Sequence, residues 1–428
     1  MARALYVQLA DCLEDEILRG MYSPGARLPT TRELAVRFST TPVTVGRALR
    51  ELRDRHRIVS RVGSGSYVLH GAEPACGAFP REDLREIFRC ILDEDAAAAF
   101  AYEPSEGYAP LVEALRVRMT REGMDIANDR ILPCSGTQQA LNLAFDVLLR
   151  EGDWVLVSSP TYPGALRLLA QRGVRIESMP IGATGPNQRE LRRIFASRPL
   201  RMVYATPVYH NPTGRCWPAE IADELRRLCD EHGVYLVEDD PCSDLSFGAS
   251  VPRPIRMRCG ASPYHLYIHS FSRSFLPGAR LGVCVVPHLL HAPLSEAKRD
   301  QDLCTSGFFQ RVFHRFLESG AHEDRIQRMN QLNESLFPQC MALATAFANE
   351  TGVDIVQPDG GFSLWCAPPP GSDVSSFFLE TARQALPVLD GAKYEAVPTH
   401  GGSFVLSFPT LDPDEWKRVL DELAAILA

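Results

Sequence analysis

Apolar side chains recur at helical spacing near the start of the chain. They mark one face of a helix predicted over residues 5–18. A second helix is predicted from Thr30 to about Phe38, because Thr30 and Glu33 form an S/T-x-x-E capping box. The chain therefore begins with two short amphipathic helices.

A third helix is predicted after the Ser39-Thr40 break, with Thr41 as its cap and Pro42 in its first position. Helical spacing gives it an inward face of Val45, Ala48, Leu49 and Leu52 and an outward face of Thr44, Arg47 and Arg50. Two helices separated by a turn of three or four residues are typical of a helix-turn-helix, in which the second helix enters the major groove of DNA.

Residues 58–68 have the pattern of a hairpin with a glycine turn, which would form a wing beside the helices. Over the whole stretch, residues 5–68 resemble the GntR-type winged helix-turn-helix, notably in PGARLPTTRELAVRF, TPVTVGRALREL and RVGSGSYV. A small helical cap with solvated arginines is the simpler alternative. The resemblance implies binding to double-stranded DNA, and the candidate contacts are Arg32, Thr44, Arg47, Arg50 and Arg61.

From Arg81 onward, helical patterns alternate with short apolar strands. Strands are predicted over residues 153–158, 201–205, 234–237 and 281–286, and helices over 138–150 and 218–232. Alternating β and α units predict a mainly parallel sheet covered by helices on both faces. Residues 71–80 are small and turn-prone, so we expect a short linker between domains at 1–70 and 81–428.

Four polar motifs fall where such sheets bind ligands, at strand ends and helix N-termini. Ser135-Gly136-Thr137 opens a helix near Gln138, so its amides and hydroxyls suit a phosphate. Glu238-Asp239-Asp240 follows a predicted strand and places acids at its mouth. The other motifs are Asn211-Pro212-Thr213-Gly214 and the pair Ser270-Phe271-Ser272-Arg273 and Pro277-Gly278-Ala279-Arg280. Each is weak alone, but their order is specific.

In that order, residues 81–428 resemble a fold-type I aminotransferase of the class I/II group. The matching stretches are YEPSEGYAPLVEALR, SSPTYPGA, TPVYHNPTG, VEDDP, SFSRSFLPGARLG and PDGGFSLW. Fused behind a GntR-type head, this is the arrangement of the MocR-type regulators. The implied fold class is a multidomain α/β protein, in which a winged helix-turn-helix precedes a fold-type I transferase-like domain with a mainly parallel sheet and a smaller C-terminal α/β subdomain.

The resemblance also implies roles for single residues toward pyridoxal 5'-phosphate. Its phosphate would be held by Ser135, Gly136, Thr137, Ser270, Ser272 and Arg280. Tyr162 would stack on the pyridine ring, Asn211 would bind the phenolic oxygen, and Asp239 would pair with the ring nitrogen, which makes the ring an electron sink. Tyr102 resembles the tyrosine that reaches the partner subunit's phosphate, which implies a homodimer.

Three positions depart from the family pattern. The Schiff-base lysine lies in S-F-S-K in the family, whereas this chain has Arg273 there, which offers no free amine. Cys242 stands in place of a tyrosine that supports the phenolic oxygen, and Val405 in place of the arginine that clamps the substrate carboxylate. A single change could reflect a mutated chain or an arginine-biased genome, but the three together predict no transamination. No catalytic residue is therefore assigned.

Composition adds three constraints. The net charge of −8 combines a basic head, with eleven arginines against seven acids in residues 1–70, and an acidic remainder, so only the head is expected to meet nucleic acid. The three lysines, Lys298, Lys393 and Lys417, lie in no motif comparable to the family's. The twelve cysteines are scattered without metal spacing, and no stretch is long and apolar enough for a membrane helix, so we expect a cytoplasmic protein without metal or membrane.

Three functions remain open at this stage. The first is a homodimeric DNA-binding regulator whose body senses a small-molecule effector, either pyridoxal phosphate bound without a covalent link or another molecule. The second is a pyridoxal-phosphate-dependent enzyme of aminotransferase fold that works without the usual lysine. The third is a constitutive DNA-binding dimer whose body is a scaffold with an empty site.

Overall fold

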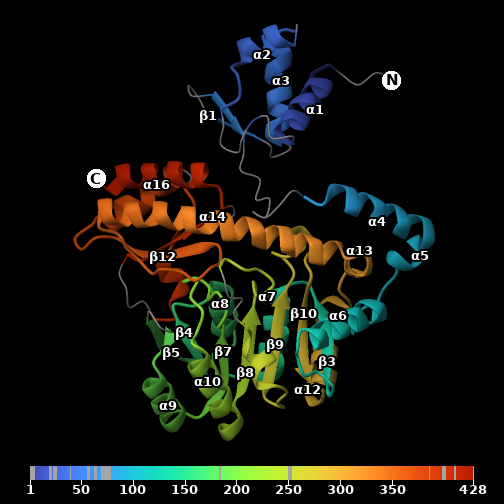
Figure 1. Ribbon diagram of the computed structural model, residues 1–428, viewed down its shortest axis with the longest axis vertical. Coiled ribbons are helices and arrows are strands. Elements are labelled where there is room, and N and C mark those ends of the chain that lie inside the picture. The colour runs from blue at the N-terminus through green and yellow to red at the C-terminus, as the bar shows by residue number, and fades with distance from the viewer. Residues whose placement is uncertain are drawn as a thin grey trace. The chain divides into compact units, whose positions relative to one another are not determined.

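The computed structural model describes residues 5–18, 22, 27–38, 40–54, 58–61, 65–68, 79–182, 185–248, 253–384, 386–397, 402–408 and 411–427. It separates into two compact units, Met1–Glu73 and Pro74–Ala428 (Figure 1). We call them the head and the body and describe each by itself. The predicted linker lies almost entirely outside the described residues.

The head consists of three helices and a hairpin, as predicted. Its elements are α1 (Leu5–Leu18), α2 (Thr31–Arg37), α3 (Pro42–Asp54), β1 (Ile58–Arg61) and β2 (Gly65–Val68). The capping box of α2 is formed: Thr30 N donates to Glu33 Oε2 at 2.7 Å, and Glu33 N donates to Thr30 Oγ1 at 3.3 Å. The apolar side chains of α1, α2 and α3 enclose one small core that includes Leu13, Leu34 and Val45.

The body is built on a sheet whose strand order is β3-β10-β9-β8-β7-β4-β5-β6. These strands are β3 (Asp129–Cys134), β4 (Trp154–Ser159), β5 (Arg175–Gly182), β6 (Gly185–Pro186), β7 (Leu200–Ala205), β8 (Tyr235–Asp240), β9 (His265–Ser270) and β10 (Gly282–Pro287). β5, β4, β7, β8 and β9 are parallel, whereas β10 runs antiparallel to both of its neighbours. The prediction of a mainly parallel sheet is confirmed.

Helices cover both faces of this sheet. One face packs against α7 (Thr137–Leu148), α8 (Pro163–Gln171) and α12 (His288–Asp302). The other packs against α6 (Ala109–Arg121), α9 (Gln188–Ser197), α10 (Ala219–His232), α11 (Ile255–Cys259) and α13 (Gly307–Glu318). α4 (Arg81–Glu94) and α5 (Ala96–Ala99) contact α13. Apolar residues at helical spacing, such as Val312 and Phe313, therefore belong to the core.

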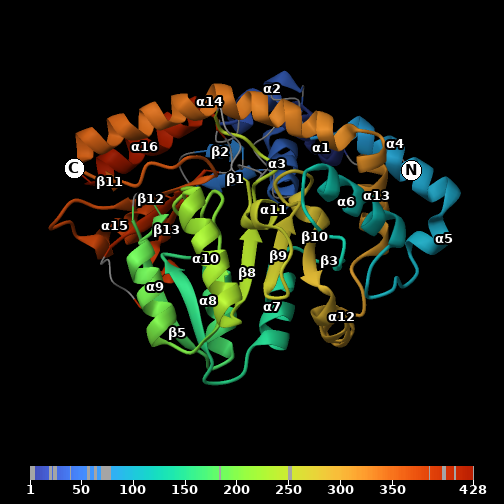
Figure 2. The ribbon, with the colours of Figure 1, turned by 60° about the horizontal axis from the view of Figure 1, so that its bottom comes forward.

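A second, smaller sheet lies toward the C-terminus and forms the predicted subdomain. Its strands are β11 (Asp354–Ile355), β12 (Ser363–Ala367), β14 (Phe404–Ser407) and β13 (Val388–Asp390), in that order across the sheet. α15 (Val374–Arg383) and α16 (Pro413–Leu427) pack on it. The 31-residue helix α14 (Ala321–Thr351) passes from α13 to α16 and so spans both sheets (Figures 1 and 2).

One strand boundary differs from the prediction. The strand predicted over residues 234–237 continues to Asp240, so the three acids lie within β8 and do not follow it. Glu238 faces the opposite side from Asp239, where its carboxylate accepts hydrogen bonds from the amides of Ile255 and Arg256. The prediction that all three acids lie at the strand mouth was therefore wrong for Glu238. Among the described helices, none has the length and apolarity that a membrane span requires.

Candidate functional site

The register of three strands brings the predicted phosphate-binding motifs together. Gly282, at the start of β10, pairs with Cys134 of β3 on one side and with Ser270 of β9 on the other. The turn after β3 therefore lies beside the turn after β9. Gly136 in the first turn has φ +83° and leads directly into α7, whose first N–H groups have no partner inside the helix.

Arg280 completes this end of the site. It ends the 3-10 helix η1 (Pro277–Ala279) with a left-handed φ of +49°, a conformation uncommon for a residue with a side chain. Its Nη2 donates to the carbonyl of Ser135 at 3.2 Å. A Cβ atom at position 136 would lie 2.7 Å from the same Nη2, so the glycine is what lets the guanidinium approach the helix N-terminus.

One predicted donor is already engaged. The Ser135 amide donates to Oε1 of Gln139 at 2.7 Å, and the Gln139 amide nitrogen donates in turn to Asp302. Gln139 therefore competes for a group that we assigned to phosphate. The N–H groups of Gly136 and Thr137, the hydroxyls of Ser270 and Ser272, and Arg280 make up the remaining donor set.

Asp239 lies at the end of β8, on the face of the sheet that carries α7. Tyr204 OH donates to Asp239 Oδ2 at 2.7 Å, whereas the buried Oδ1 has no hydrogen-bond partner within normal distance among the described residues. Burial raises the pKa of Asp239 to about 7, although the hydrogen bond from Tyr204 and the nearby side chain of Thr137 both act in the opposite direction. An unpaired, desolvated carboxylate oxygen fits a cationic nitrogen from outside the chain.

The aromatic ring of Tyr162 lies near this carboxylate in a fixed orientation. Its hydroxyl donates to Gln138 Oε1 at 3.0 Å, and a Cβ atom on Gly164 would lie 2.3 Å from the tyrosine ring. Gly164 and Gln138 therefore fix the ring orientation that stacking on a ligand requires. Burial raises the pKa of Tyr162, so its phenol stays protonated and neutral.

Asn211 and the three departures from the family pattern line one common cavity of about 160 Å³. The described residues lining it are Tyr209, Asn211, Gly214, Pro241, Cys242, Arg273, Gly361, Phe362, Ser363, Leu389, Tyr394, Val405 and Ser407. They come from the loops after β7, β8 and β9 and from the small sheet, so the cavity lies between the two sheets. The guanidinium carbon of Arg273 lies 4.5 Å from the centre of the Phe362 ring.

His210, which precedes Asn211, is engaged by hydrogen bonds on both sides of its ring. Its Nε2 lies 2.9 Å from Ser158 Oγ, and its Nδ1 lies 2.9 Å from Thr213 Oγ1. Burial lowers the pKa of His210 to about 3, so the ring is neutral. Both ring nitrogens of this histidine are therefore engaged in structural contacts.

The residues present fit a phosphorylated pyridine bound without a covalent link. The glycine turn with Arg280 offers donors and charge for a phosphate, and Asp239 offers an unpaired carboxylate oxygen for a ring nitrogen. At the far end, Arg273 offers a permanent cation where a free amine would be needed.

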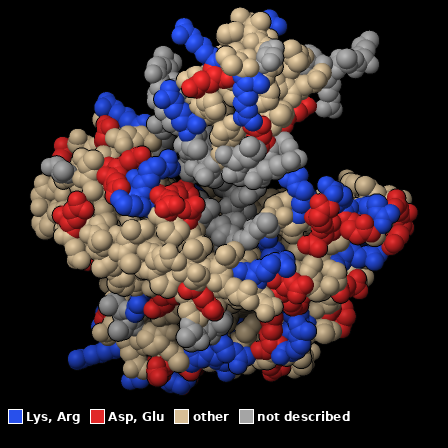
Figure 3. All heavy atoms as spheres, turned by 45° about the horizontal axis from the view of Figure 1, so that its top comes forward, with Lys and Arg blue, Asp and Glu red and all other residues tan. Residues whose placement is uncertain are grey.

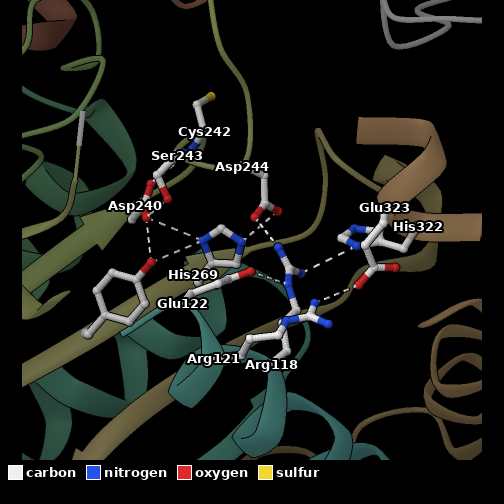
Figure 4. Close-up of polar contacts among 11 residues, drawn as sticks. Arg118, Arg121, Glu122, Asp240, Cys242, Ser243, Asp244, His269, His322 and Glu323 are labelled. Carbon is white, nitrogen blue, oxygen red and sulfur yellow. Dashed lines mark hydrogen bonds and ion pairs between the residues drawn. The ribbon is translucent and has the colours of Figure 1, made fainter. Parts of the chain in front are cut away.

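A charged network lies on the opposite face of the sheet (Figure 4). His269 of β9 bridges two acids, with Nε2 at 2.9 Å from Asp244 and Nδ1 at 3.5 Å from Asp240. Burial alone would lower its pKa, but the Asp244 and Asp240 carboxylates outweigh burial and raise it to about 10. Arg118 of α6 pairs with Asp244 at 2.5 Å, so the loop after β8 is tied to α6.

This network extends to α14 and borders a larger cavity of about 830 Å³. Arg121 of α6 pairs with Glu323 of α14 at 3.3 Å, and Arg118 Nη1 lies 3.5 Å from His322 Nδ1 (Figure 4). The cavity carries charges of both signs, and its arginines are engaged: Arg118 with Asp244 and Glu122, and Arg253 with the Glu122 carbonyl. Its charges therefore largely compensate one another.

In the head, two of the three residues on the predicted outward face of α3, Arg47 and Arg50, are exposed. The third, Thr44, is half-buried with its hydroxyl 3.0 Å from that of Thr41, and Arg32 on α2 is exposed. The side chain of Arg61 lies outside the described residues. On the face shown in Figure 3, basic and acidic side chains are interspersed over the body. Tyr102 of the body is 85% exposed, so no pocket of the described chain encloses it.

Several site residues had no assigned role in the sequence analysis. Tyr204, Gln138, Gln139 and Gly164 support the predicted ligands, while Asp240, Asp244 and His269 form the network behind them. A signal for the network was present in HLYIHS, because His265, Tyr267 and His269 alternate with apolar residues. This alternation indicates a strand with one polar face.

Both units match known families. Residues 5–68 match the family described as bacterial regulatory proteins, gntR family, and residues 76–423 match aminotransferase class I and II. The 2-aminoadipate transaminase of Thermus thermophilus is 30% identical over 365 residues, which cover 84% of this chain and 89% of that protein. The uncharacterized HTH-type transcriptional regulator YdfD of Bacillus subtilis is 23% identical over 468 residues, which cover 99% of this chain and 96% of that protein.

Among solved structures, the kynurenine aminotransferase of Pyrococcus horikoshii has a TM-score of 0.76 and 26% identity, covering 89% of this chain and 93% of that chain. The body is therefore a fold-type I aminotransferase domain, of a fold family that binds pyridoxal phosphate, and the head is a DNA-binding domain of the GntR type. The chain belongs to the MocR-type group of GntR-family transcription regulators, which join these two domains.

Proposed function

We propose that this regulator is a homodimer whose body binds a phosphorylated pyridine without a covalent link and uses it as a signal. One observation carries the proposal. The same body keeps the glycine turn, Arg280 and the unpaired Asp239 oxygen, yet has Arg273 at the end of the site where a free amine would be needed. It is equipped to hold the ligand but not to bond to it.

In this proposal each ligand-facing residue has one task. The amides of Gly136 and Thr137, the hydroxyls of Ser270 and Ser272, and Arg280 bind the phosphate. Tyr162 stacks on the ring, Asn211 binds the phenolic oxygen, and Asp239 holds the proton on the ring nitrogen. When bound, pyridoxal phosphate supplies an electron sink. None of the described residues that line the cavity offers an amine to move a proton at the reacting carbon, so the proposed body does not transaminate.

The head reads DNA in the same proposal. Thr44, Arg47 and Arg50 on α3 contact base edges in the major groove, while Arg32 and Arg61 contact phosphates. Tyr102, which is exposed in the single chain, completes the site of the second subunit. The ligand regulates DNA binding only if it prefers one arrangement of the dimer over another.

The decisive experiment is an absorbance titration of the purified protein with pyridoxal 5'-phosphate, followed by borohydride treatment and intact mass. We expect a saturable spectral change without added mass. A borohydride-stable adduct on the wild-type chain would contradict noncovalent binding. A protein that shows no spectral change would contradict the choice of ligand.

DNA binding is tested separately with a paired substitution. Arg47→Ala with Arg50→Ala should reduce operator affinity at least about tenfold, since each base contact is worth about 1–3 kcal/mol. Arg85→Ala with Arg89→Ala on α4 is the matched control, because these arginines are exposed and pair with acids on their own helix. Unchanged operator binding by the α3 variant would disprove the recognition-helix assignment.

A second candidate is an enzyme that works without the lysine. It is favoured by the 30% identity to a protein named 2-aminoadipate transaminase and by the retained Asp239. Turnover of any member of an amino acid panel that includes 2-aminoadipate, with pyridoxal phosphate present, would establish this candidate. We expect no turnover above the rate of the free cofactor.

A further inference from the structure

The cavity between the two sheets contains a cation that has no counter-ion among the described residues. Arg273 is the only arginine, lysine, histidine, aspartate or glutamate among the described residues that line it. No carboxylate of the described residues lies within ion-pair distance of its guanidinium, which instead stacks on the Phe362 ring. A half-buried charge without a partner is costly, so this arrangement favours an anion from outside the chain.

The remaining lining suits a small organic anion. Asn211, Ser363 and Ser407 supply neutral hydrogen-bonding groups, while Phe362 and Tyr394 supply apolar walls. The volume holds on the order of ten water-sized groups, which suits a small acid and excludes a peptide. The stacked guanidinium keeps its N–H edges for a bidentate contact, the geometry that a carboxylate matches.

The charge enters the cavity from one side only, among the described residues that line it. Val405 of β14 is 1% exposed and packs with Trp365 and Tyr394, so β14 presents an apolar side chain to the cavity. A carboxylate entering here therefore meets one cation, Arg273, on the loop after β9. An ammonium group in the same place would be repelled by that cation.

We propose that this cavity is a carboxylate site read by Arg273, beside the pyridine that the body binds; the inference rests on the proposed function. The carboxylate is carried either by the pyridine itself, in place of its aldehyde, or by a second small molecule. Either way, the signal that the regulator reads is an acid, and an amine-bearing form of the same pyridine binds more weakly.

Two ligands that differ only in this group test the proposal. 4-Pyridoxic acid 5'-phosphate and pyridoxamine 5'-phosphate share the phosphate, ring nitrogen and phenol. By calorimetry we expect the wild-type protein to bind the acid at least about tenfold more tightly, as a charge-assisted bidentate contact implies. Arg273→Gln should remove the preference, whereas the control Arg189→Gln on the exposed face of α9 should keep it.

A second pair of probes locates the carboxylate. Protein saturated with pyridoxal 5'-phosphate is titrated with succinate and with its neutral diamide, succinamide. If the acid pyridine shows no preference but succinate binds in an Arg273-dependent way, the proposal holds with the carboxylate on a second molecule. If Arg273→Gln unfolds, Arg273→Met, which keeps a long unbranched side chain, takes its place.

The failures of the two proposals can be told apart. If both pyridine phosphates bind equally and succinate binds no better than succinamide, the carboxylate site is disproved and the proposed function stands. If neither pyridine phosphate binds, the proposed function fails and the carboxylate site fails with it.

Discussion

The two ends of the candidate site in the body differ in how many residues of the family pattern they retain. The phosphate end retains the glycine turn, Arg280 and Asp239, and its geometry is tight enough that a single methyl group on Gly136 would meet Arg280. The cavity end contains Cys242, Arg273 and Val405 at three positions where the family pattern has other residues. If the proposed function holds, binding and bond formation are separable within one fold, because they depend on different ends of the site.

The largest effect is expected from replacing Arg273, which stands where covalent bonding to the ligand would need an amine. Arg273→Lys supplies an amine to a site that otherwise holds the ligand, so we expect a borohydride-stable adduct with pyridoxal phosphate at residue 273. The readout is intact mass followed by peptide mapping. Transamination should still be absent, because Val405 cannot clamp a substrate carboxylate.

Two controls accompany this variant. Arg273→Gln should form no adduct, because it has no amine. Lys393→Arg in the Arg273→Lys background removes an exposed lysine and should leave the adduct in place. An adduct that maps to Lys393 in both Arg273→Lys and Arg273→Gln, and that is lost in the Lys393→Arg background, would show that residue 273 is not the residue facing the ligand.

The second test concerns Asp239 and pH. Its pKa is about 7 in the folded chain against an ordinary value of 3.8, so between these pH values the folded state binds more protons than the unfolded state. The free energy of unfolding without ligand should therefore fall as pH rises through this window, by up to about 4 kcal/mol. The asparagine of Asp239→Asn cannot ionise, so the free energy of unfolding of this variant should rise relative to that of wild type between pH 4 and pH 7.

Urea unfolding at pH 5, 6, 7 and 8 measures this difference. A bound pyridinium should reverse the trend, because a cation beside Asp239 favours the ionised carboxylate and lowers its pKa. Parallel stability curves for wild type and Asp239→Asn would show that the pKa of the Asp239 carboxyl is not raised in the folded chain. This result would contradict the proposal that the carboxyl binds a cation from outside the chain.

The third test isolates the glycine turn. Gly136→Ala and Gly152→Ala both place a side chain at positive φ, of +83° and +85°, and each should cost about 1–2 kcal/mol of stability. At Gly152 nothing lies within 4 Å of the added Cβ, whereas at Gly136 Arg280 must move. Only Gly136→Ala should weaken pyridoxal phosphate binding, by about ten- to hundredfold. Equal pyridoxal phosphate affinities of the two variants would contradict a role of Arg280 in phosphate binding.

The smallest effect is expected from restoring a phenol at the cavity end. Cys242→Tyr should tighten pyridoxal phosphate binding by about two- to tenfold, the range of one hydrogen bond. Overpacking at this buried position should cost about 1–3 kcal/mol of stability. Cys242→Phe is the control, since it adds the ring without the hydroxyl. Tighter binding by both variants would assign the gain to packing.

The head and the sheet were predictable from local patterns. The Thr30–Glu33 capping box and the strand periods are set by residues within a few positions of one another, so sequence alone locates them. The end of β8 was not predictable in this way. Acids are depleted from strands, but Glu238 and Asp240 are stabilised there by His265 and Tyr267 on the neighbouring strand β9.

Single candidate residues could be named from the sequence where each lies in a recognisable motif, whereas groupings that depend on how distant segments pack could not. Gly136, Arg280 and Asp239 each lie in a motif of their own, at the ends of neighbouring strands. That Cys242, Arg273 and Val405 share one cavity, by contrast, depends on how the small sheet packs on the large one. The competition of Gln139 for the Ser135 amide depends on one side-chain rotamer and has no signature in the sequence.

Helix α14 connects parts of the body that lie far apart. At about 1.5 Å per residue its 31 residues extend about 46 Å, and the helix contacts both α13, which covers the large sheet, and β11 of the small sheet. A tilt of about 5° at the end near the small sheet carries the other end by about 4 Å. If a ligand shifts the small sheet relative to Arg273, α14 is the described helix through which that shift would reach α13 on the large sheet.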